Sequence, residues 1–258
     1  MPQDRAIPTE RPATVLTTLV KVNGTDLPEK YKTEAIAITN EVNRIPTAKL
    51  VIIDGTASGE KFEASNEAMF APGAEVEIQA GYQSANELLF KGIIIKHSIK
   101  VRGNGSSVLT IECRDKAIKM TIGKKNKYFA DVKDSAAIEE IVGTYSGLSI
   151  DAEATDVTQK QLVQYNSTDW DFMLSRADVN ERLCIVENGS IYIKKPDLSQ
   201  TPVLSLVYGA SILELDMEID ARHQYGQVAA YAWGSDDQAV TEQQVNDPNV
   251  SVAGNISA

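Results

Sequence analysis

The sequence predicts a mainly β protein with α-helical insertions (an α+β fold). Three observations lead to this prediction: apolar and polar residues alternate in short segments of residues 15–115, apolar residues follow a helical spacing in two segments between residues 134 and 177, and alternation returns after residue 197. Alternation with a period of two is typical of half-buried antiparallel strands, whereas apolar residues three and four apart form one face of a helix. Because the chain has 258 residues, it has room for one large or two modest domains.

The first part of the chain is interpreted as an extended arm followed by a β domain. Residues 1–14 contain three prolines and no periodicity, so they are expected to form the arm. Residues 15–115 are expected to form a first small β-barrel, with turns at Asn23-Gly24, Asp54-Gly55 and residues 103–106. Strands are predicted in six segments: 17–22, 34–39, 48–53, 75–82, 90–101 and 108–113.

Residues 116–196 are expected to form a helix-rich connecting domain. Asp134-Ser135 offer N-caps for a first helix that ends near Gly147, and Ser167-Thr168 begin a second helix that reaches about Ala177. The second helix is expected to pack between the barrels through four apolar anchors: Trp170, Phe172, Met173 and Leu174.

Two further segments complete this connecting domain. The basic run that includes Lys119 and Lys124-Lys125-Asn126-Lys127 has no apolar period, so it is expected to be a solvated loop. A β-hairpin is predicted from residues 184–187 and 190–194, with Asn188-Gly189 as its turn.

Residues 197–258 are expected to begin a second β-barrel and to end in a polar tail at 235–258. Four apolar residues alternate with four acids over 213–220, which predicts a strand with a solvated or partner-facing acidic side, and a further strand is expected at 227–233. One base, Arg222, accompanies nine acids in this part: Asp197, Glu214, Asp216, Glu218, Asp220, Asp236, Asp237, Glu242 and Asp247. We therefore expect salt-sensitive docking to a basic partner surface.

Composition argues against several functional classes. The net charge is −11, from 25 Lys and Arg against 36 Asp and Glu, which disfavours binding to a nucleic-acid backbone. No run approaches 18 apolar residues, so no transmembrane helix is predicted. The opening residues lack the apolar core of a signal peptide, and synthesis in the cytosol is expected.

The candidate catalytic and metal-binding groups each have a simpler structural interpretation. Asp169 and Asp171 lie in the first turn of the expected second helix, where a carboxylate complements the helix dipole. No close Cys or His pair typical of zinc is present, and both cysteines are expected to be free buried thiols. The scarce metal-ligating residues are far apart: Cys113, Cys184, His97 and His223. We therefore expect no catalytic residue, no metal site and no cofactor.

Two stretches resemble the VgrG / phage late-control protein D family. Pro72-Gly73 followed by Phe90-Lys91-Gly92 is similar to the family's first-barrel signature, and the stretch from Gln164 to Met173 resembles its Q-Y-x-x-[ST]-D-W-D-F motif. The motif order is also similar over about residues 15 to 235. Two departures from the family pattern look more like the extracellular injection and phage-tail-like members. Many members carry Glu before the Ser/Thr-Asp-Trp, where this chain has Ser167-Thr168, and many have a Gly shortly after the helix, where this chain has Glu181-Arg182-Leu183-Cys184. Eleven residues carry the resemblance: Pro72, Gly73, Phe90, Gly92, Gln164, Tyr165, Asp169, Trp170, Asp171, Phe172 and Arg176.

The resemblance implies a structural role without catalysis. It implies two tube-type β-barrels of the phage baseplate-hub kind, joined by a helical segment, in a protomer of a homotrimer. Such a trimer forms a pseudo-sixfold ring that adapts the spike of a contractile injection system, phage tail-like or type VI, to the hexameric inner tube. The implied partners are the inner-tube (Hcp-like) protein and the spike-tip and baseplate proteins, without nucleic acid or stable membrane insertion. Assembly is then cytoplasmic, and the particle is released from the cell or delivered into a target cell.

Two alternative functions remain open from the residues. One is a standalone β-rich module that binds a ligand or peptide. The other is an enzyme such as a cell-wall hydrolase, although no separated Glu/Asp pair stands out in a loop that forms a cleft. In the family, a second Pro-Gly and Phe-x-Gly set completes the second barrel. No copy of this set follows Trp233, so the second barrel is expected to be incomplete in this chain.

Overall fold

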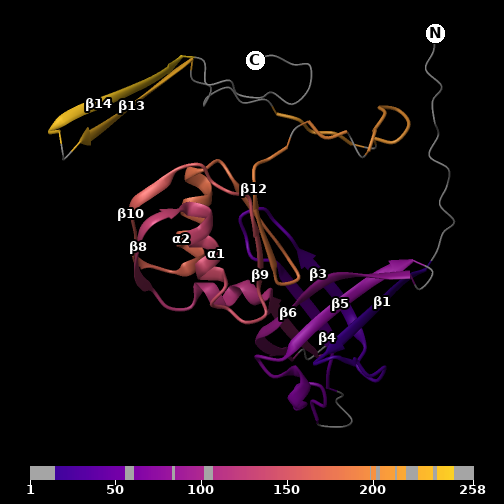
Figure 1. The fold of residues 1–258 in the computed structure, drawn as a ribbon. Helices are drawn as coiled ribbons and strands as arrows, with labels where there is room; N and C mark the ends of the chain where they lie inside the picture. The colour runs from indigo at the N-terminus through magenta and orange to yellow at the C-terminus, as the bar shows by residue number, and fades with distance from the viewer. Residues whose placement is uncertain are drawn as a thin grey trace. The chain divides into compact units, whose positions relative to one another are not determined.

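The computed structural model describes residues 15–55, 61–82, 85–101, 107–197, 199–201, 204–212, 214–218, 226–234 and 237–246. Its described part is mainly β with two α-helices, as the sequence predicts (Figure 1). The chain divides into a large unit, residues 11–196, and a small unit, residues 1–10 with 197–258. The four-part domain division expected from the sequence stays a prediction.

The large unit begins with an antiparallel sheet of seven strands, whose order is β2-β1-β5-β6-β7-β4-β3. This order leaves β2 and β3 at the edges, so the pairs between described strands form an open sheet and no closed barrel. The strand bounds are β1 (Leu16–Val22), β2 (Thr25–Asp26), β3 (Thr33–Thr39), β4 (Thr47–Ile53), β5 (Glu75–Tyr82), β6 (Ala85–Lys100) and β7 (Val108–Arg114).

Alternation along these strands builds the first core. Val76 and Ile78 of β5 are buried, while Glu75, the first residue of this strand, is exposed. The 3-10 helix η1 (Ala68–Phe70) adds Phe70 to this core. Its ring packs edge to face on the ring of Tyr31, with the two centroids 5.3 Å apart. The predicted strands are therefore confirmed, although β6 begins at Ala85, five residues earlier than expected.

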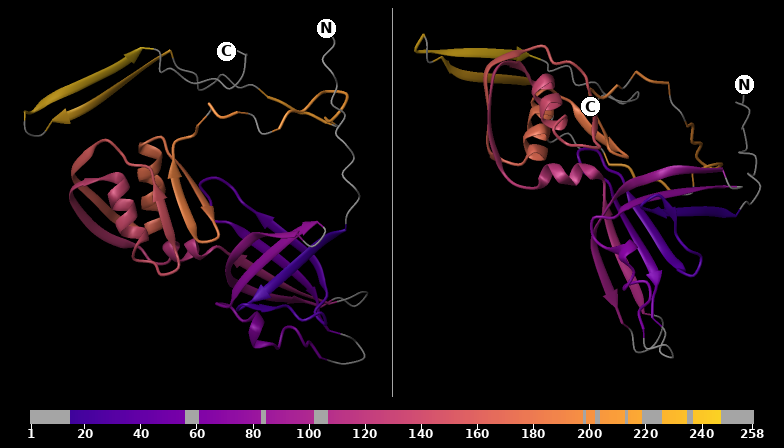
Figure 2. Two further views of the ribbon diagram at one scale, coloured as in Figure 1. Left: turned by 45° about the vertical axis from the view of Figure 1, so that its right-hand side comes forward. Right: turned by 60° about the horizontal axis from the view of Figure 1, so that its bottom comes forward.

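The second part of the large unit surrounds its own core. The antiparallel ribbon of β8 and β10 lies beside α1 and α2, and a three-stranded sheet has the order β11-β12-β9 (Figures 1 and 2). The bounds are η2 (Lys116–Thr121), β8 (Lys125–Lys133), α1 (Asp134–Val142), β9 (Ser149–Ala152), β10 (Thr158–Ser167), α2 (Asp169–Val179), β11 (Leu183–Glu187) and β12 (Ser190–Lys194).

Both helices and the hairpin occur where the sequence predicts them, with one difference in length. The first helix ends at Val142 instead of near Gly147, because residues 143–147 form turns that close with Gly147 at a φ of +82°. Asn188 and Gly189 both have positive φ, as the tight turn between β11 and β12 requires.

The prediction of a solvated basic loop was wrong. Residues 116–121 form η2, and Lys125 to Lys133 form β8. Two of these lysines are accommodated in the strand because carboxylates pair with their ammonium groups. Lys125 Nζ lies 2.6 Å from Asp169 Oδ2, and Lys127 Nζ lies 2.7 Å from Glu140 Oε1.

The small unit contains one described hairpin, β13 (Gln227–Gly234) with β14 (Ala239–Asn246). β13 confirms the strand predicted at 227–233, whereas β14 contradicts the expectation of an unstructured polar tail. The strand predicted at 213–220 was wrong for residues 214–218, which have no strand partner among the described residues. Residues 213, 219 and 220 lie outside the described part. Alternation marks two faces, but a strand also needs a neighbour to receive its backbone hydrogen bonds.

None of the helices in the described part of the chain is long and apolar enough to span a bilayer.

Candidate functional site

The residues of the motif from Gln164 to Phe172 lie at the end of β10 and in the first turn of α2. Thr168 caps this helix, since its Oγ1 accepts a hydrogen bond from the Asp171 N–H at 3.0 Å and donates one to Asp171 Oδ2 at 2.6 Å. A Thr followed three residues later by an acid is a common way to satisfy the free N–H groups of a helix start. Asp171 thus stays at the surface and serves the cap.

Asp169 is the centre of a buried polar cluster. Its carboxylate accepts hydrogen bonds from Lys125 Nζ at 2.6 Å, the Tyr145 hydroxyl at 2.6 Å and Gln164 Nε2 at 2.8 Å. Burial alone would raise the pKa of Asp169, but the hydrogen bonds from Gln164, Lys125 and Tyr145 outweigh it and hold that pKa below its ordinary value. Lys125 Nζ also donates to the Tyr145 hydroxyl, and its hydrogen bonds to Asp169 and Tyr145 raise the pKa of Lys125. The cluster of Asp169 with its three donors therefore connects β8, the turn after α1, β10 and α2.

Arg176 forms a second connection within this part of the chain. Its guanidinium contacts Asp134 at two points, Nε to Oδ1 at 2.6 Å and Nη2 to Oδ2 at 3.0 Å, and Asn180 adds a third donor at 3.0 Å. Burial raises the pKa of Asp134, but the bonds from Arg176 and Asn180 dominate, so the net pKa is lowered. This bidentate ion pair joins the first turn of α1 to the last turn of α2.

The apolar motif residues of α2 are packing residues. Trp170 is 7% exposed and Met173 is fully buried. The Phe172 ring stacks on Phe129 of β8, with centroids 6.0 Å apart and planes 7° apart. Leu174 is partly buried against the same core. α2 is thus held by aromatic contacts on one side and by ion pairs at both ends.

The remaining residues of this motif differ sharply in burial. Gln164 is buried, and its Nε2 also donates to the Ser167 carbonyl at 3.2 Å, while its Oε1 has no hydrogen-bond partner among the described residues. Tyr165, the next residue, is 79% exposed and takes no part in the packing around α2.

The motif residues of the first sheet shape the junction of β5, β6 and β7. Gly73 forms the turn before β5 with a φ of +98°, and its N–H donates to the Ile94 carbonyl at 2.8 Å. Pro72 precedes it at the surface, and Phe90 is buried opposite Ile78. A Cβ on Gly92 would lie 2.2 Å from the Arg114 carbonyl oxygen, so no side chain fits there.

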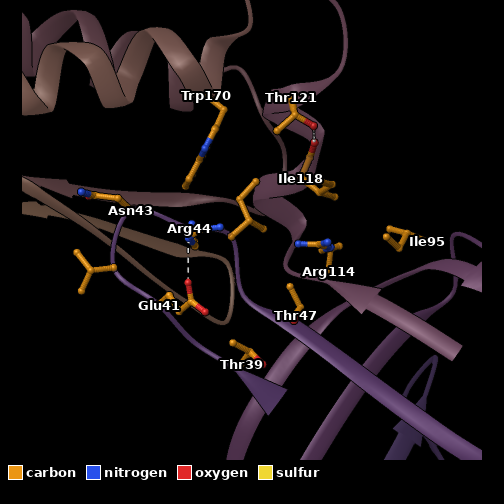
Figure 3. A pocket seen from close by; sticks show the side chains of 12 residues that line it. Thr39, Glu41, Asn43, Arg44, Thr47, Ile95, Arg114, Ile118, Thr121 and Trp170 are labelled. Carbon is orange, nitrogen blue, oxygen red and sulfur yellow. Dashed lines mark hydrogen bonds and ion pairs between the residues drawn. The ribbon is translucent and has the colours of Figure 1, made fainter. Parts of the chain in front are cut away.

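Within the large unit, a groove of about 770 Å³ lies between the first sheet and the start of α2. Trp170 points into it from α2, and Arg114 reaches in from the end of β7 (Figure 3). The loop between β3 and β4 forms the opposite wall, where Glu41 and Arg44 make an ion pair of 2.9 Å. None of the ion pairs between described residues includes Arg114. The groove therefore combines an aromatic edge with an available guanidinium.

Two residues that position the groove were missed by the sequence analysis. Asn43 has a φ of +60°, its N–H donates to the Cys184 carbonyl at 2.7 Å, and its Oδ1 accepts from the Cys184 N–H at 2.8 Å. Asp115 is buried and accepts from the N–H groups of Ala117 and Gly189, both at 2.8 Å. The capping role of Asp115 could have been predicted, because Asp is a common cap residue at the start of a helix. The contacts of Asn43 with β11 could not, because they join residues 141 positions apart.

The other sequence candidates have structural surroundings where they are described. Cys113 and Cys184 are free and buried, as expected, and burial raises the pKa of each thiol to about 12. His97 Nδ1 lies 3.2 Å from the Phe70 carbonyl, and His223 is outside the described residues. In the described segments, no three Cys, His, Asp or Glu side chains gather as a metal site would require.

Comparison with solved structures identifies the fold. A tail protein from Neisseria meningitidis MC58 is similar with a TM-score of 0.65 and 15% identity, over 92% of this chain and 69% of that protein. The 43 kDa tail protein of prophage MuSo2 from Shewanella oneidensis has a TM-score of 0.61 and 15% identity, over 92% and 71% of the two chains. Prophage tail protein gp18 from Listeria monocytogenes EGD-e has a TM-score of 0.53 and 9% identity, over 90% and 67%. The chain therefore has a fold found in phage tail proteins.

Comparison of sequences gives the family. No curated protein matches the chain. The family model of the Alg8 N-terminal domain, in contrast, matches residues 12–258, which is nearly the whole sequence. The chain thus belongs to the Alg8 N-terminal domain family.

Proposed function

We propose that this chain is a structural hub component of a contractile injection machine, similar in role to the VgrG / late-control protein D family. The observation that carries the proposal is the tail-protein fold, which extends over 92% of the chain in two solved tail proteins. In this proposal three copies form a ring with pseudo-sixfold symmetry that joins the spike to the inner tube. The machine is a phage tail-like particle or a type VI system, assembled in the cytoplasm and then released or delivered.

The buried acids support a structural role over an enzymatic one. Asp169, Asp134 and Asp115 each face donors from other elements of the same unit, and the first two are balanced by Lys125 and Arg176. A general acid or base needs access to a substrate proton, whereas these carboxylates hold secondary-structure elements together. We therefore propose that the chain acts without catalysis or cofactor.

The sheets support an assembly role. β3 is a seven-residue edge strand with one row of backbone groups unpaired by the other described strands, and such an edge is a ready partner for a neighbouring subunit. The β13–β14 hairpin is almost entirely exposed, and an isolated two-stranded hairpin is only marginally stable. In our proposal the seven-stranded sheet corresponds to the first tube-type barrel, and the hairpin belongs to the second.

One experiment distinguishes this proposal from its main alternative. The mass of the purified chain is measured alone and after mixing with rings of the inner-tube protein from the same organism, and the complexes are imaged by electron microscopy. Trimers that cap the rings are expected. The groove beside Trp170 favours the alternative of a standalone ligand- or peptide-binding module. A monomer that ignores the rings and saturates with a small ligand or peptide would establish that alternative instead.

A further inference from the structure

The groove beside Trp170 in the large unit has the size and the rigidity of a binding site. Its volume of about 770 Å³ lies within the range of about 300–1,000 Å³ that is typical of ligand sites. The end of the first sheet, the loop between β3 and β4, η2 and Trp170 surround it (Figure 3). Hydrogen bonds of Asn43 with Cys184 and of Asp115 with Gly189 join the first sheet to the second part of the unit. The groove is therefore formed before anything enters it.

Three polar side chains form a row across the sheet at this groove, hereafter the polar row. Thr39 of β3 is paired with Thr47 of β4, and Thr47 is paired with Arg114 of β7. Residues directly opposite each other on neighbouring strands have side chains on the same face, with Cβ atoms about 4.5–5.5 Å apart. The adjacent residues Ala48 and Cys113 are buried in the core, so the polar row lies on the outer face, where it lines the groove.

The polar row keeps its hydrogen-bonding groups for a ligand. None of its three side chains makes a hydrogen bond or an ion pair with another described residue, whereas the Thr121 hydroxyl in the same groove donates to the Ile118 carbonyl at 2.7 Å. The row thus offers two hydroxyls and a planar guanidinium. A guanidinium is well suited to a carboxylate, because it can donate two parallel hydrogen bonds to the two oxygens.

The charges around the groove favour an anion. Arg44 is paired with Glu41, with Nε 2.9 Å from Oε2, so this pair adds no net charge. Arg114 takes part in none of the ion pairs between described residues, and neither does Lys49, which is exposed two positions after Thr47 on the same face of β4. The groove therefore attracts a negative group, although the chain has a net charge of −11.

The apolar part of the groove indicates which anion fits. Five apolar side chains line it: Val42, Ile45, Ile95, Ile118 and Trp170. A free phosphate has no apolar group to place against them, and its second charge is repelled by the Glu41 carboxylate. A peptide, in contrast, presents one carboxylate to Arg114 and neighbouring apolar side chains to the walls, and aromatic residues such as Trp170 supply large contact areas to such partners.

We propose that this groove binds an extended acidic peptide of a partner protein. One Asp or Glu carboxylate of the peptide accepts hydrogen bonds from Arg114 and Thr47, the Thr39 hydroxyl faces the peptide backbone, and flanking apolar side chains pack on Trp170. The site goes beyond the proposed hub function, because it does not depend on whether copies of the chain form a ring.

The two tryptophans of the chain allow a direct measurement. Trp233 is 63% exposed and lies in the small unit, so Trp233→Phe leaves Trp170 as the single tryptophan of the full chain. The emission of Trp170 is titrated with a pool of blocked pentapeptides that have Glu at the centre and Leu, Val or Phe on each side, and with a matched pool that has Gln at the centre. We expect the Glu pool to change the emission and to bind about tenfold more tightly than the Gln pool, because only a carboxylate gains charge-assisted hydrogen bonds.

Substitutions in the Trp233→Phe chain identify the residues responsible. Arg114→Gln should remove the preference for the Glu pool, and Thr47→Val, which keeps the shape of the side chain without its hydroxyl, should reduce it. Lys160→Gln is the matched control, because Lys160 is an exposed cation of β10 that does not line the groove, and it should keep the preference. All three variants should keep the melting temperature of the Trp233→Phe chain.

The outcomes decide between the possible occupants. Absence of binding by either pool, equal binding of the two pools, or a preference that survives Arg114→Gln overturns the site. Sodium acetate or inorganic phosphate that competes as well as the Glu pool at equal concentration assigns the groove to a small free anion, which overturns the peptide. If Arg114→Gln does not fold, the comparison of the two pools and Thr47→Val still decide. Capping of the inner-tube rings is measured separately, so a groove that binds no peptide leaves the hub function standing.

Discussion

At the scale of single residues, the position of the Asp169 carboxylate has two physical explanations. Asp169 occupies the first turn of α2, as its sequence position predicted, where it complements the helix dipole. It also accepts three hydrogen bonds from Lys125, Tyr145 and Gln164, which come from other elements. The first role was visible in the sequence, and the second depends on residues up to 44 positions away.

Asp169 should make stability depend on acid pH. Its pKa is lower in the folded chain than the ordinary value of about 3.9, so the stability that it contributes is full above that value and is lost as the pH falls through the folded pKa. We expect Asp169→Asn to lower the free energy of unfolding most at neutral pH, and the difference from the unsubstituted chain to shrink below about pH 4. Urea unfolding at a series of pH values measures this difference, with Asp178→Asn, at an exposed acid of the same helix, as control. A difference that stays constant with pH would contradict it.

Trp170 gives the second prediction at this scale. Because its indole is 7% exposed and packs in the core of the second part, Trp170→Ala should lower the free energy of unfolding by about 3–5 kcal/mol. The chain's other tryptophan, Trp233, is 63% exposed, and Trp233→Ala should change it by less than about 0.5 kcal/mol. Chemical denaturation followed by circular dichroism checks both, and equal effects of the two substitutions would be incompatible with an anchoring role for Trp170.

At the scale of elements, alternation and capping were enough wherever the partner lay close along the chain. β5 was predicted from Val76 and Ile78, and its neighbour β6 begins only three residues after it ends. α2 was predicted from Thr168 and its apolar spacing, and its cap is entirely local. These signals are physical consequences of local geometry, so they do not depend on the rest of the fold.

Elements that depend on distant partners were predicted poorly. β8 looked like a solvated loop because lysines occupy its inward positions, and their carboxylate partners Glu140 and Asp169 could not be assigned beforehand. The opposite error occurred at residues 214–218, where alternation is regular but no described strand lies alongside. Gly92 is a further example of a distant partner that the sequence does not reveal. This position must lack a side chain because the Arg114 carbonyl oxygen of β7 occupies the space where a Cβ would lie.

At the scale of the whole molecule, negative charge is unevenly distributed along the chain. The strands β8 and β10 are basic, whereas residues 197–258 contain nine acids and one base. Among those acids, Glu214, Asp216 and Glu218 follow one another at every second position and are all exposed. This distribution suits contacts in which an acidic segment meets a basic partner surface.

Assembly should consequently weaken in salt. Screening shortens the range of charge interactions from about 10 Å at 0.1 M ionic strength to about 3 Å at 1 M, so a contact steered by exposed acids loses most of its attraction. We expect the apparent Kd between the chain and the inner-tube rings to rise at least tenfold between these two salt concentrations. The variant Glu214→Gln/Asp216→Asn/Glu218→Gln should bind more weakly at low salt and depend less on salt. If both chains bind equally at both concentrations, the acidic segment takes no part in docking, and the attraction must come from uncharged surfaces.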